Sequence, residues 1–293
     1  MPKHSNSGDQ ARHEIERIDG DLHTLLIRRS ALGAVRDREP PPTEGHWVPA
    51  RHPAETAEVL RGILSRHQGS LPRRALVGIW SDILFAADTE TTLHVYAAEN
   101  AEGYWDLART HFGGMIPMVT HSSAIAVVHA CADDATALGI VPPPESVEDR
   151  KAWWDELAPV GRPGPRFVHS LPFVADENSR TALPRGYAIG TIEQRPTGAD
   201  TTILRLECHS ELSRTRLQTL LRQAGFDAQI IAASRESIRS SASRVLVANS
   251  GFVAPDDARL ASFVVKAGDA IDRVSLIGGF ANPVSGDANR AGP

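Results

Sequence analysis

Two arginines, Arg12 and Arg29, stand in an otherwise apolar helical pattern near the start of the chain. The apolar residues recur at intervals of three and four, at Ile15, Ile18, Leu22, Leu25, Leu26, Leu32 and Val35. This spacing predicts a helix from Gln10 to Arg38 with one apolar face. Both arginines fall on that face, where a charge without a partner is unfavourable. Because a guanidinium matches a carboxylate in a bidentate geometry, the pattern indicates a site for a small anion.

Asp19 supplies an alternative explanation, because it follows Ile18 on the same face. A buried ion pair between Asp19 and either arginine would account for that arginine alone, since buried charges are normally paired. The presence of both arginines on one face favours a ligand.

The separation of Arg12 and Arg29 sets the geometry of such a site. Seventeen residues correspond to roughly 25 Å along a helix, which no small metabolite spans. If both arginines touch one ligand, they must come from two chains. An antiparallel pair of these helices would form a two-fold dimer with two equivalent sites.

The run from Arg12 to Arg29, with Ile15, Ile18-Asp19, Leu22 and Leu25-Leu26 at helical spacing, resembles the first helix of the all-helical chorismate mutases. The resemblance covers residues 1–92 and implies an intertwined helical dimer that binds chorismate. In that family one arginine of the first helix acts in its own site and the other in the partner's. The resemblance therefore implies that Arg12 and Arg29 hold the two carboxylates of the substrate.

Two further helices are expected in this region. The Pro-rich loop of residues 39–47 ends the first helix, and a second helix follows over residues 53–67. Its expected apolar face consists of Val59, Leu60, Ile63 and Leu64. Pro72 then opens a third helix. Three helices in this order of lengths are similar to a mutase subunit.

The resemblance also assigns the remaining site positions. Arg36 or Arg38 would replace a lysine that the family carries after its first helix, and Arg51 would reach the substrate from the following loop. Thr91 aligns with a glutamine that donates to the ether oxygen, and a one-residue shift would place Glu90 there. Such a glutamate must be protonated to donate; a solvated charge at a helix end is the plainer interpretation of Glu90.

Residues 93–195 predict a small α/β domain with a parallel sheet. The expected strands are 93–96, 117–120 and 137–142, and the expected helices are 105–112 and 122–131. The run Gly139-Ile140-Val141-Pro142-Pro143-Pro144-Glu145 resembles a Gly-Val-Val-Pro-x-Glu-Asn stretch of prephenate dehydratases. The Thr-Arg-Phe motif of that family is not found, and Asn178-Ser179-Arg180-Thr181 is a weak echo. The segment is expected to be dehydratase-like in fold and inactive.

Residues 196–285 predict a β-α-β-β-α-β order, which is that of ferredoxin-like domains. The expected strands are 203–206, 229–233, 245–249 and 274–277, and the expected helices are 213–225 and 256–268. After a dehydratase-like segment, this order resembles the regulatory ACT domain. Glu193-Gln194-Arg195-Pro196 precedes the first strand, so no effector site is assigned to it. Residues 286–293 form a polar tail.

Composition narrows the classes of protein further. A net charge of −5 lacks the basic footprint of a nucleic-acid binder. Two cysteines, Cys131 and Cys208, far apart in sequence, argue against a disulfide framework or a zinc site. No apolar run reaches the eighteen residues of a membrane span, and no apolar signal core begins the chain. We expect a cytoplasmic protein without membrane contact, metal or cofactor.

The sequence therefore predicts a multidomain α+β protein: a helical, mutase-like dimerisation domain, a dehydratase-like α/β domain and a ferredoxin-like, ACT-like domain. The expected function is a chorismate mutase of aromatic amino-acid biosynthesis, converting chorismate into prephenate. The alternative is a degenerate relative that binds a small anion or aromatic ligand and acts in regulation. Arg12 and Arg29 favour the enzyme, whereas Glu55, Thr56 and Thr91, at positions where the family carries other residues, favour the binding protein.

Overall fold

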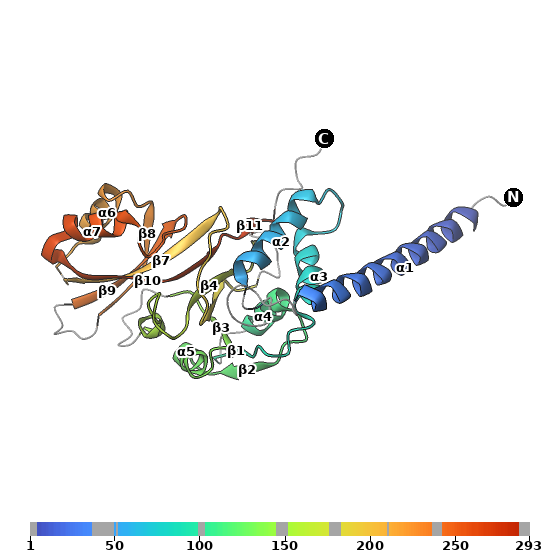
Figure 1. The fold of residues 1–293 in the computed structure, drawn as a ribbon, viewed down its shortest axis with the longest axis horizontal. Coiled ribbons are helices and arrows are strands. Elements are labelled where there is room, and N and C mark those ends of the chain that lie inside the picture. The colour runs from blue at the N-terminus through green and yellow to red at the C-terminus, as the bar shows by residue number, and fades with distance from the viewer. Residues whose placement is uncertain are drawn as a thin grey trace. The chain divides into compact units, whose positions relative to one another are not determined.

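The computed structural model describes most of the chain, in two compact units, Met1–Val48 and Pro49–Pro293 (Figure 1). The described residues are 5–36, 50, 52–98, 103–144, 152–175, 183–209, 211–235 and 242–286. The second unit is built on a nine-stranded mixed sheet, so the expected α+β class is confirmed. The predictions for Arg38 and Arg51 lie outside the described residues.

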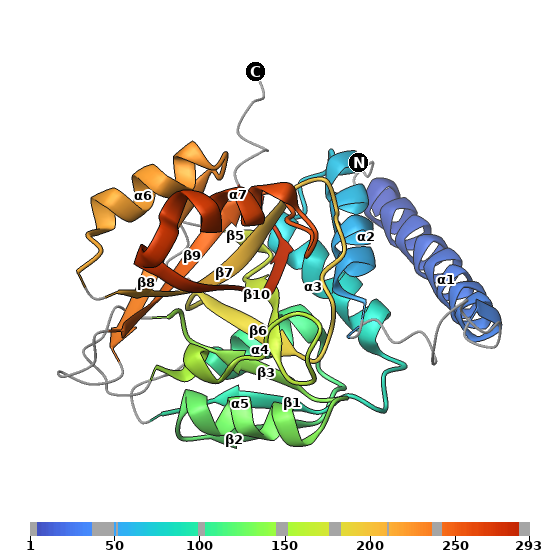
Figure 2. The ribbon, with the colours of Figure 1, turned by 60° about the vertical axis from the view of Figure 1, so that its left-hand side comes forward.

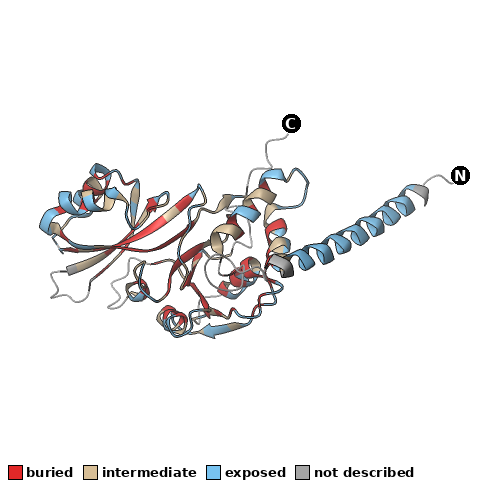
Figure 3. Cartoon of the chain, viewed as in Figure 1, coloured by how far each residue is buried: buried red, intermediate tan, exposed pale blue. Residues whose placement is uncertain are grey.

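The described part of the first unit is one long helix, α1 (Ser5–Arg36), close to the predicted range. Its apolar stripe is not buried: Ile15, Ile18, Leu22, Leu25, Leu26 and Leu32 are 44% to 62% exposed. Figure 3 shows the exposed colour along the helix. Arg17 pairs with Glu14 at 2.7 Å and with Asp21 at 2.9 Å, away from the stripe. Such pairs add only a few tenths of a kcal/mol each, so the apolar stripe still lacks a packing surface within this unit.

The next two helices are α2 (Pro53–Arg66), close to its predicted range, and α3 (Arg73–Phe85), which begins directly after Pro72 as expected. The structure places them in the second unit, where α2 packs against α3 and strand β10 (Ile271–Ala281). The expected apolar face of α2 is partly wrong, because Val59 is 41% exposed while Thr56 is buried. Packing on α3 and β10, rather than helical periodicity alone, decides which side of α2 is inside.

Arg61 holds α2 in place on this unit. Its guanidinium donates to Thr197 Oγ1 at 2.7 Å, to the Ala199 carbonyl at 2.7 Å and to the Asn282 carbonyl at 2.8 Å. These bonds join the helix to the loops at the ends of the central strands, since hydrogen bonds from a charged donor are among the stronger ones.

The α/β region follows the predicted order. It contains β1 (Leu93–Tyr96), α4 (Tyr104–Phe112), β2 (Met118–His121), α5 (Ala124–Asp133) and β3 (Leu138–Val141). Strand β1 runs parallel to both β2 and β3, as expected for a sheet made of alternating strands and helices. Helices α4 and α5 both pack on β1 and β3, and β3 is buried along its whole length.

Between this region and the C-terminal one, the structure has a short 3-10 helix, η2 (Trp153–Glu156), where a linker-like helix at Trp153 and Trp154 was expected. Three strands there were not expected from the sequence: β4 (Arg166–Leu171), β5 (Val174–Ala175) and β6 (Gly186–Gly190). Strand β6 lies between β3 and β4 and is antiparallel to both. The predicted parallel arrangement is confirmed for β1, β2 and β3, and β6 and β4 extend it into a mixed sheet.

The C-terminal region has the predicted β-α-β-β-α-β order. Its elements are β7 (Asp200–His209), α6 (Arg214–Gln223), β8 (Ala228–Arg235), β9 (Ala242–Ser250), α7 (Ala258–Ala267), the short η3 (Gly268–Ala270) and β10, followed by β11 (Val284–Ser285). The strands lie in the order β10-β7-β9-β8, and α6 and α7 cover one face (Figure 2). This is the ferredoxin-like arrangement.

The two regions share one sheet, because β10 also runs parallel to β4, with Gly278 opposite Phe167. Gly278 has a φ of 101°, and a Cβ built there would lie 2.3 Å from the Phe167 carbonyl oxygen. Only glycine permits this approach. The predicted boundary at residues 195 and 196 lies between β6 and β7, and the sheet continues across it.

Both cysteines are free and buried. Cys131 lies in α5 and Cys208 in β7. Burial raises the pKa of each thiol to about 12. The thiols therefore act as small apolar side chains in the core.

Replacing Gly278 by alanine should sharply destabilise the second unit. The added Cβ meets backbone atoms that cannot move independently, and φ is positive, so we expect a loss of about 3 kcal/mol or more. Urea unfolding followed by circular dichroism would measure the loss.

Gly251→Ala is the matched control, because its φ is 91° and a Cβ there meets nothing within 4 Å. We expect it to cost only about 1 kcal/mol. Equal losses for the two variants would show that contact with Phe167 does not constrain the sheet.

Candidate functional site

The two arginines predicted to bind the ligand are both exposed on α1. Asp19 is also exposed, and it makes no ion pair with either arginine. The alternative of a buried Asp19–arginine pair is therefore not observed. Separated by roughly 25 Å of helical rise, Arg12 and Arg29 do not meet within one copy of this helix.

Glu90 and Thr91 lie in the second unit, in the turn before β1. Asp88 Oδ1 accepts the Glu90 amide at 3.2 Å and the Thr91 amide at 3.0 Å. Glu90 is exposed, whereas Thr91 is 1% exposed and its hydroxyl has no partner among the described residues. This turn directs the chain into β1.

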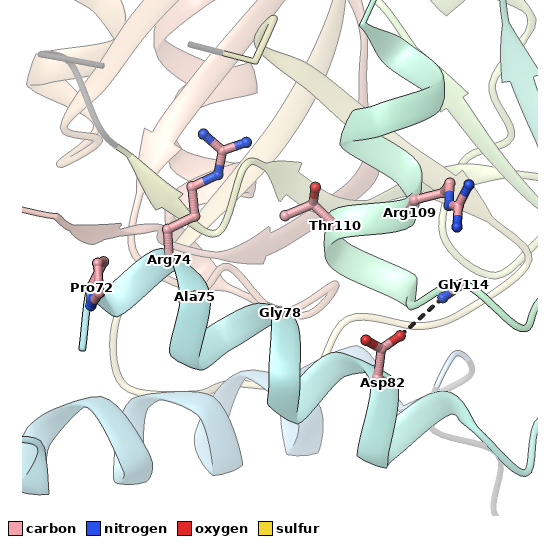
Figure 4. Close-up of a pocket in the computed structure, with 8 residues that line it drawn as sticks. All are labelled: Pro72, Arg74, Ala75, Gly78, Asp82, Arg109, Thr110 and Gly114. Carbon is pink, nitrogen blue, oxygen red and sulfur yellow. Dashed lines mark hydrogen bonds between the residues drawn. The ribbon is translucent and has the colours of Figure 1, made fainter. Parts of the chain in front are cut away.

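A groove lies between α3 and α4 in the second unit. It has a volume of about 570 Å³, and its walls carry Arg74, Gly78, Asp82, Arg109 and Thr110. In Figure 4, Arg74 rises from the first turn of α3, and Arg109 and Thr110 come from α4. We call this site the α3–α4 groove. Its volume is in the range of pockets that take small molecules.

The charges of the α3–α4 groove are only partly neutralised. Asp82 Oδ1 accepts the Gly114 amide at 3.0 Å, which is the dashed line in Figure 4. The Arg109 guanidinium has neither an ion pair nor a hydrogen-bond partner in the described ranges, although the Arg109 carbonyl accepts the Gly113 amide. Gly113, with a φ of 77°, allows the chain to turn against Asp82, because a Cβ there would lie 2.8 Å from Asp82 Oδ1. The Asp82 carboxylate is thus held by the Gly114 amide, and the Arg109 side chain remains available to an anion.

A small void shares two lining residues, Arg74 and Thr110, with the groove. It has a volume of about 10 Å³ and is lined by Arg74, Thr110, His111 and Phe173, with apolar neighbours. A void of this size has room for about one water molecule. His111 is 3% exposed, and neither of its ring nitrogens has a partner among the described residues.

His111 belongs to a buried aromatic cluster. Its ring lies 4.7 Å from that of His169 and 4.6 Å from that of Phe112, centroid to centroid. Burial lowers the pKa of His111 to about 4. Burial, with the neighbouring His111, also holds the pKa of His169 well below its usual value. Both rings are therefore neutral near pH 7, and each can donate one hydrogen bond and accept another.

Sequence reasoning missed Arg74, Arg109 and His111. Arg74 stands in the first turn of a helix without an acidic residue, an unusual charge pattern that was visible in the sequence. His111 sits four residues after Leu107 on the buried face of α4, where a histidine is uncommon enough to be noted. Nothing in the sequence indicated that α3 and α4 are neighbours.

The described residues were searched for metal-ligand clusters and for membrane-spanning helices. Within the described ranges, no three histidine, cysteine or acidic side chains cluster in a way that could hold a metal ion. None of the helices described is both long and apolar enough to cross a membrane.

Comparison with known proteins gave matches only among solved structures. No protein-family model matches the chain, and no curated protein matches it. GqqA, described as a novel type of quorum-quenching acylase, is 13% identical, covers 65% of this chain and 94% of its own, and has a TM-score of 0.46. The prephenate dehydratase from Streptococcus mutans is also 13% identical, covering 65% of this chain and 98% of its own, with a TM-score of 0.44.

A third match is a prephenate dehydratase from Arthrobacter aurescens in complex with L-Phe. It is 9% identical, covers 66% of this chain and 90% of its own, and has a TM-score of 0.44. The structures found thus include prephenate dehydratases. Their low identities and TM-scores do not establish an activity for this chain.

The buried histidine should make stability depend on pH. In the unfolded chain a histidine has a pKa of about 6.5, above the folded value for His111. Its neutral form is therefore favoured by folding, and stability is fully present above about pH 6.5 and falls as the pH drops towards 4. We expect His111 to account for a loss of about 3 kcal/mol over that range, measured by urea unfolding near pH 7 and near pH 4.

His111→Phe removes this ring and should reduce the loss between pH 7 and pH 4 by about 3 kcal/mol, while the buried His169 keeps its own contribution. His129→Gln is the control, because His129 is exposed on α5 and is not desolvated by folding. A pH dependence that is unchanged in His111→Phe would contradict the assignment.

Proposed function

We propose that the protein is a homodimer that pairs through α1, and that the paired helices bind chorismate or a similar small dicarboxylate. The observation that carries the proposal is the exposed apolar stripe of α1, with Arg12 and Arg29 on it. A stripe of this length is unfavourable in water, and a second copy of the same helix would cover it.

An antiparallel pairing satisfies both the apolar residues and the charges. If Arg12 of one copy lies opposite Arg29 of the other, the two-fold axis passes beside Gly20, and Ile15 lies opposite Leu26. Apolar side chains then meet across the pair. The arginines repel each other unless an anion lies between them, and a dicarboxylate supplies one carboxylate for each.

Such a site suits the conversion of chorismate into prephenate. This rearrangement is pericyclic, so it needs no nucleophile, metal or proton relay. The protein must hold the folded conformer and stabilise charge on the breaking ether oxygen. Arg12 and Arg29 would hold the carboxylates, while Arg38, Arg51, Glu90 and Thr91 are the candidates from the family resemblance for the remaining contacts.

A binding-only protein is the second candidate, and one observation favours it. The Thr91 side chain, aligned with the residue that donates to the ether oxygen, is 1% exposed, and its turn is fastened by Asp88. A side chain buried in this way does not contact a substrate without a local rearrangement. The chain would then bind the anion and act in regulation, with residues 93–195 as a dehydratase-like scaffold and residues 196–285 as an ACT-like domain. The ferredoxin-like strand order supports the latter.

The two candidates differ in what happens to chorismate. The purified full-length protein is mixed with chorismate, and the loss of its ultraviolet absorbance is followed. Turnover supports the mutase, whereas saturable binding without turnover supports the binding protein. Neither turnover nor binding would refute both.

Arg29→Ala should abolish chorismate binding or turnover while leaving the fold intact. Losing a bidentate contact with a carboxylate should weaken affinity at least tenfold. Arg28→Ala is the matched control, since Arg28 is also exposed on α1 but lies roughly 100° around the helix from Arg29. If the two variants bind chorismate equally well, the site on α1 is wrong.

Mixed dimers test whether two chains share each site. Arg12→Ala and Arg29→Ala should each be inactive alone. After subunit exchange, a mixed dimer carries both defects in one site and none in the other, so about half the activity or binding per dimer should return. Mass spectrometry confirms the exchange. Exchange without recovery would rule out a shared site.

A further inference from the structure

The α3–α4 groove combines positive charge with room for a ligand. Arg109, whose guanidinium has no partner among the described residues, and Arg74 line it, and Asp82 is the one acid in its lining. Asp82 is already engaged by the Gly114 amide. Arg109 therefore offers a positive charge to an anion entering the groove, and its side chain can turn towards the anion without breaking another contact.

The N-terminus of α3 adds backbone donors at the same place. Pro72 precedes the helix and provides no side-chain cap, and the first turn contains no acidic residue. The amides of the first turn of a helix have no acceptor within the helix, and Pro72, Arg74 and Ala75 at this helix start line the groove. Together with the positive end of the helix dipole, they favour an anion.

The shape of the groove depends on small residues of α3. Gly78 stands in mid-helix, and a Cβ built there meets nothing within 4 Å. Packing therefore does not require glycine at this position, where it costs about 1 kcal/mol of helix stability relative to alanine. Its effect is to keep the wall open. Pro72 and Ala75 supply apolar surface beside it.

The unpaired ring of His111 indicates that a ligand group or a water molecule occupies the void that it lines. Its ring is 97% buried and neutral, and both ring nitrogens lack partners in the described chain. The void that it lines shares Arg74 and Thr110 with the groove. The Thr110 hydroxyl donates to the Asp106 carbonyl at 2.7 Å, so its oxygen can still accept a hydrogen bond from a group in the void. Buried polar atoms are rarely left unpaired, so a polar group in this void would complete the site.

We infer that the α3–α4 groove binds a small organic carboxylate that also carries a hydroxyl group. The carboxylate meets Arg109, Arg74 and the start of α3; the apolar body lies along Pro72, Ala75 and Gly78. The hydroxyl group reaches His111, directly or through one water molecule in the void. All of these residues belong to the second unit, so the site is complete within one chain and does not depend on the pairing of α1.

Two probes that differ by one hydroxyl group test this site. The full-length protein is titrated with 4-hydroxybenzoate, benzoate and inorganic phosphate, and binding is followed by nuclear magnetic resonance. 4-Hydroxybenzoate should bind saturably and at least threefold more tightly than benzoate, because only it offers a hydroxyl group to His111. In His111→Phe this preference should disappear.

Two pairs of variants separate the groove from general surface effects. Arg109→Ala should weaken the affinity for 4-hydroxybenzoate at least fivefold. Arg222 is an exposed arginine of α6, and Arg222→Ala should change that affinity less than twofold. Gly78→Leu should block the groove, and Gly62→Leu on α2, where a Cβ also meets nothing within 4 Å, should not. Circular dichroism checks that each variant is folded, and both leucine substitutions favour the helix.

Several results would overturn the inference. They are no saturable binding of 4-hydroxybenzoate, equal effects of the two arginine variants, or equal effects of the two leucine variants. A response to inorganic phosphate alone would also overturn it, because the ligand would then be a simple ion. Arg29→Ala should leave this binding unchanged, so the groove and the proposed site on α1 succeed or fail separately.

Discussion

The second unit depends on the close approach of two backbones at Gly278 and Phe167. Strand β10 is the central connection: it pairs with β7 on one side and with β4 on the other. The ferredoxin-like half and the α/β half thereby share a sheet, and α2 lies against the same strand. A side chain on residue 278 would separate the two halves. The position of α2, and through it α3 and the groove, thus follows from one residue that has no side chain.

Regular elements were predicted from the sequence with good accuracy, because their signals are local. The ranges of α1 and α2, the start of α3, and the β-α-β-β-α-β order of the C-terminal region followed from periodicity and from Pro and Gly at the ends. Strands β4 and β6 were missed, since their side chains are mostly buried and give no alternation to read. The joining of two expected domains into one sheet was missed as well, because no local pattern reports a long-range contact at Gly278.

Of the two candidate sites, the one on α1 could be predicted from local sequence, whereas the α3–α4 groove depends on long-range packing. Arg12 and Arg29 were found because a helix places residues at known angles. Arg74, Arg109 and His111 come together only when α3 packs on α4, and that contact is set by the sheet beneath them. The two sites would also respond differently to protein concentration. A site on paired α1 helices exists only in the dimer, whereas the α3–α4 groove is present in every copy.

The two buried cysteines have a practical consequence. Thiols with a pKa of about 12 are almost entirely protonated near neutral pH, and both lie inside the core. Alkylating reagents and mild oxidants act on accessible thiolate, so the two cysteines of the folded chain should not react with them. A single cysteine introduced on the exposed stripe of α1 would then be the one reactive thiol, and a spin label or fluorophore placed there would report the distance between two copies without removing any native residue.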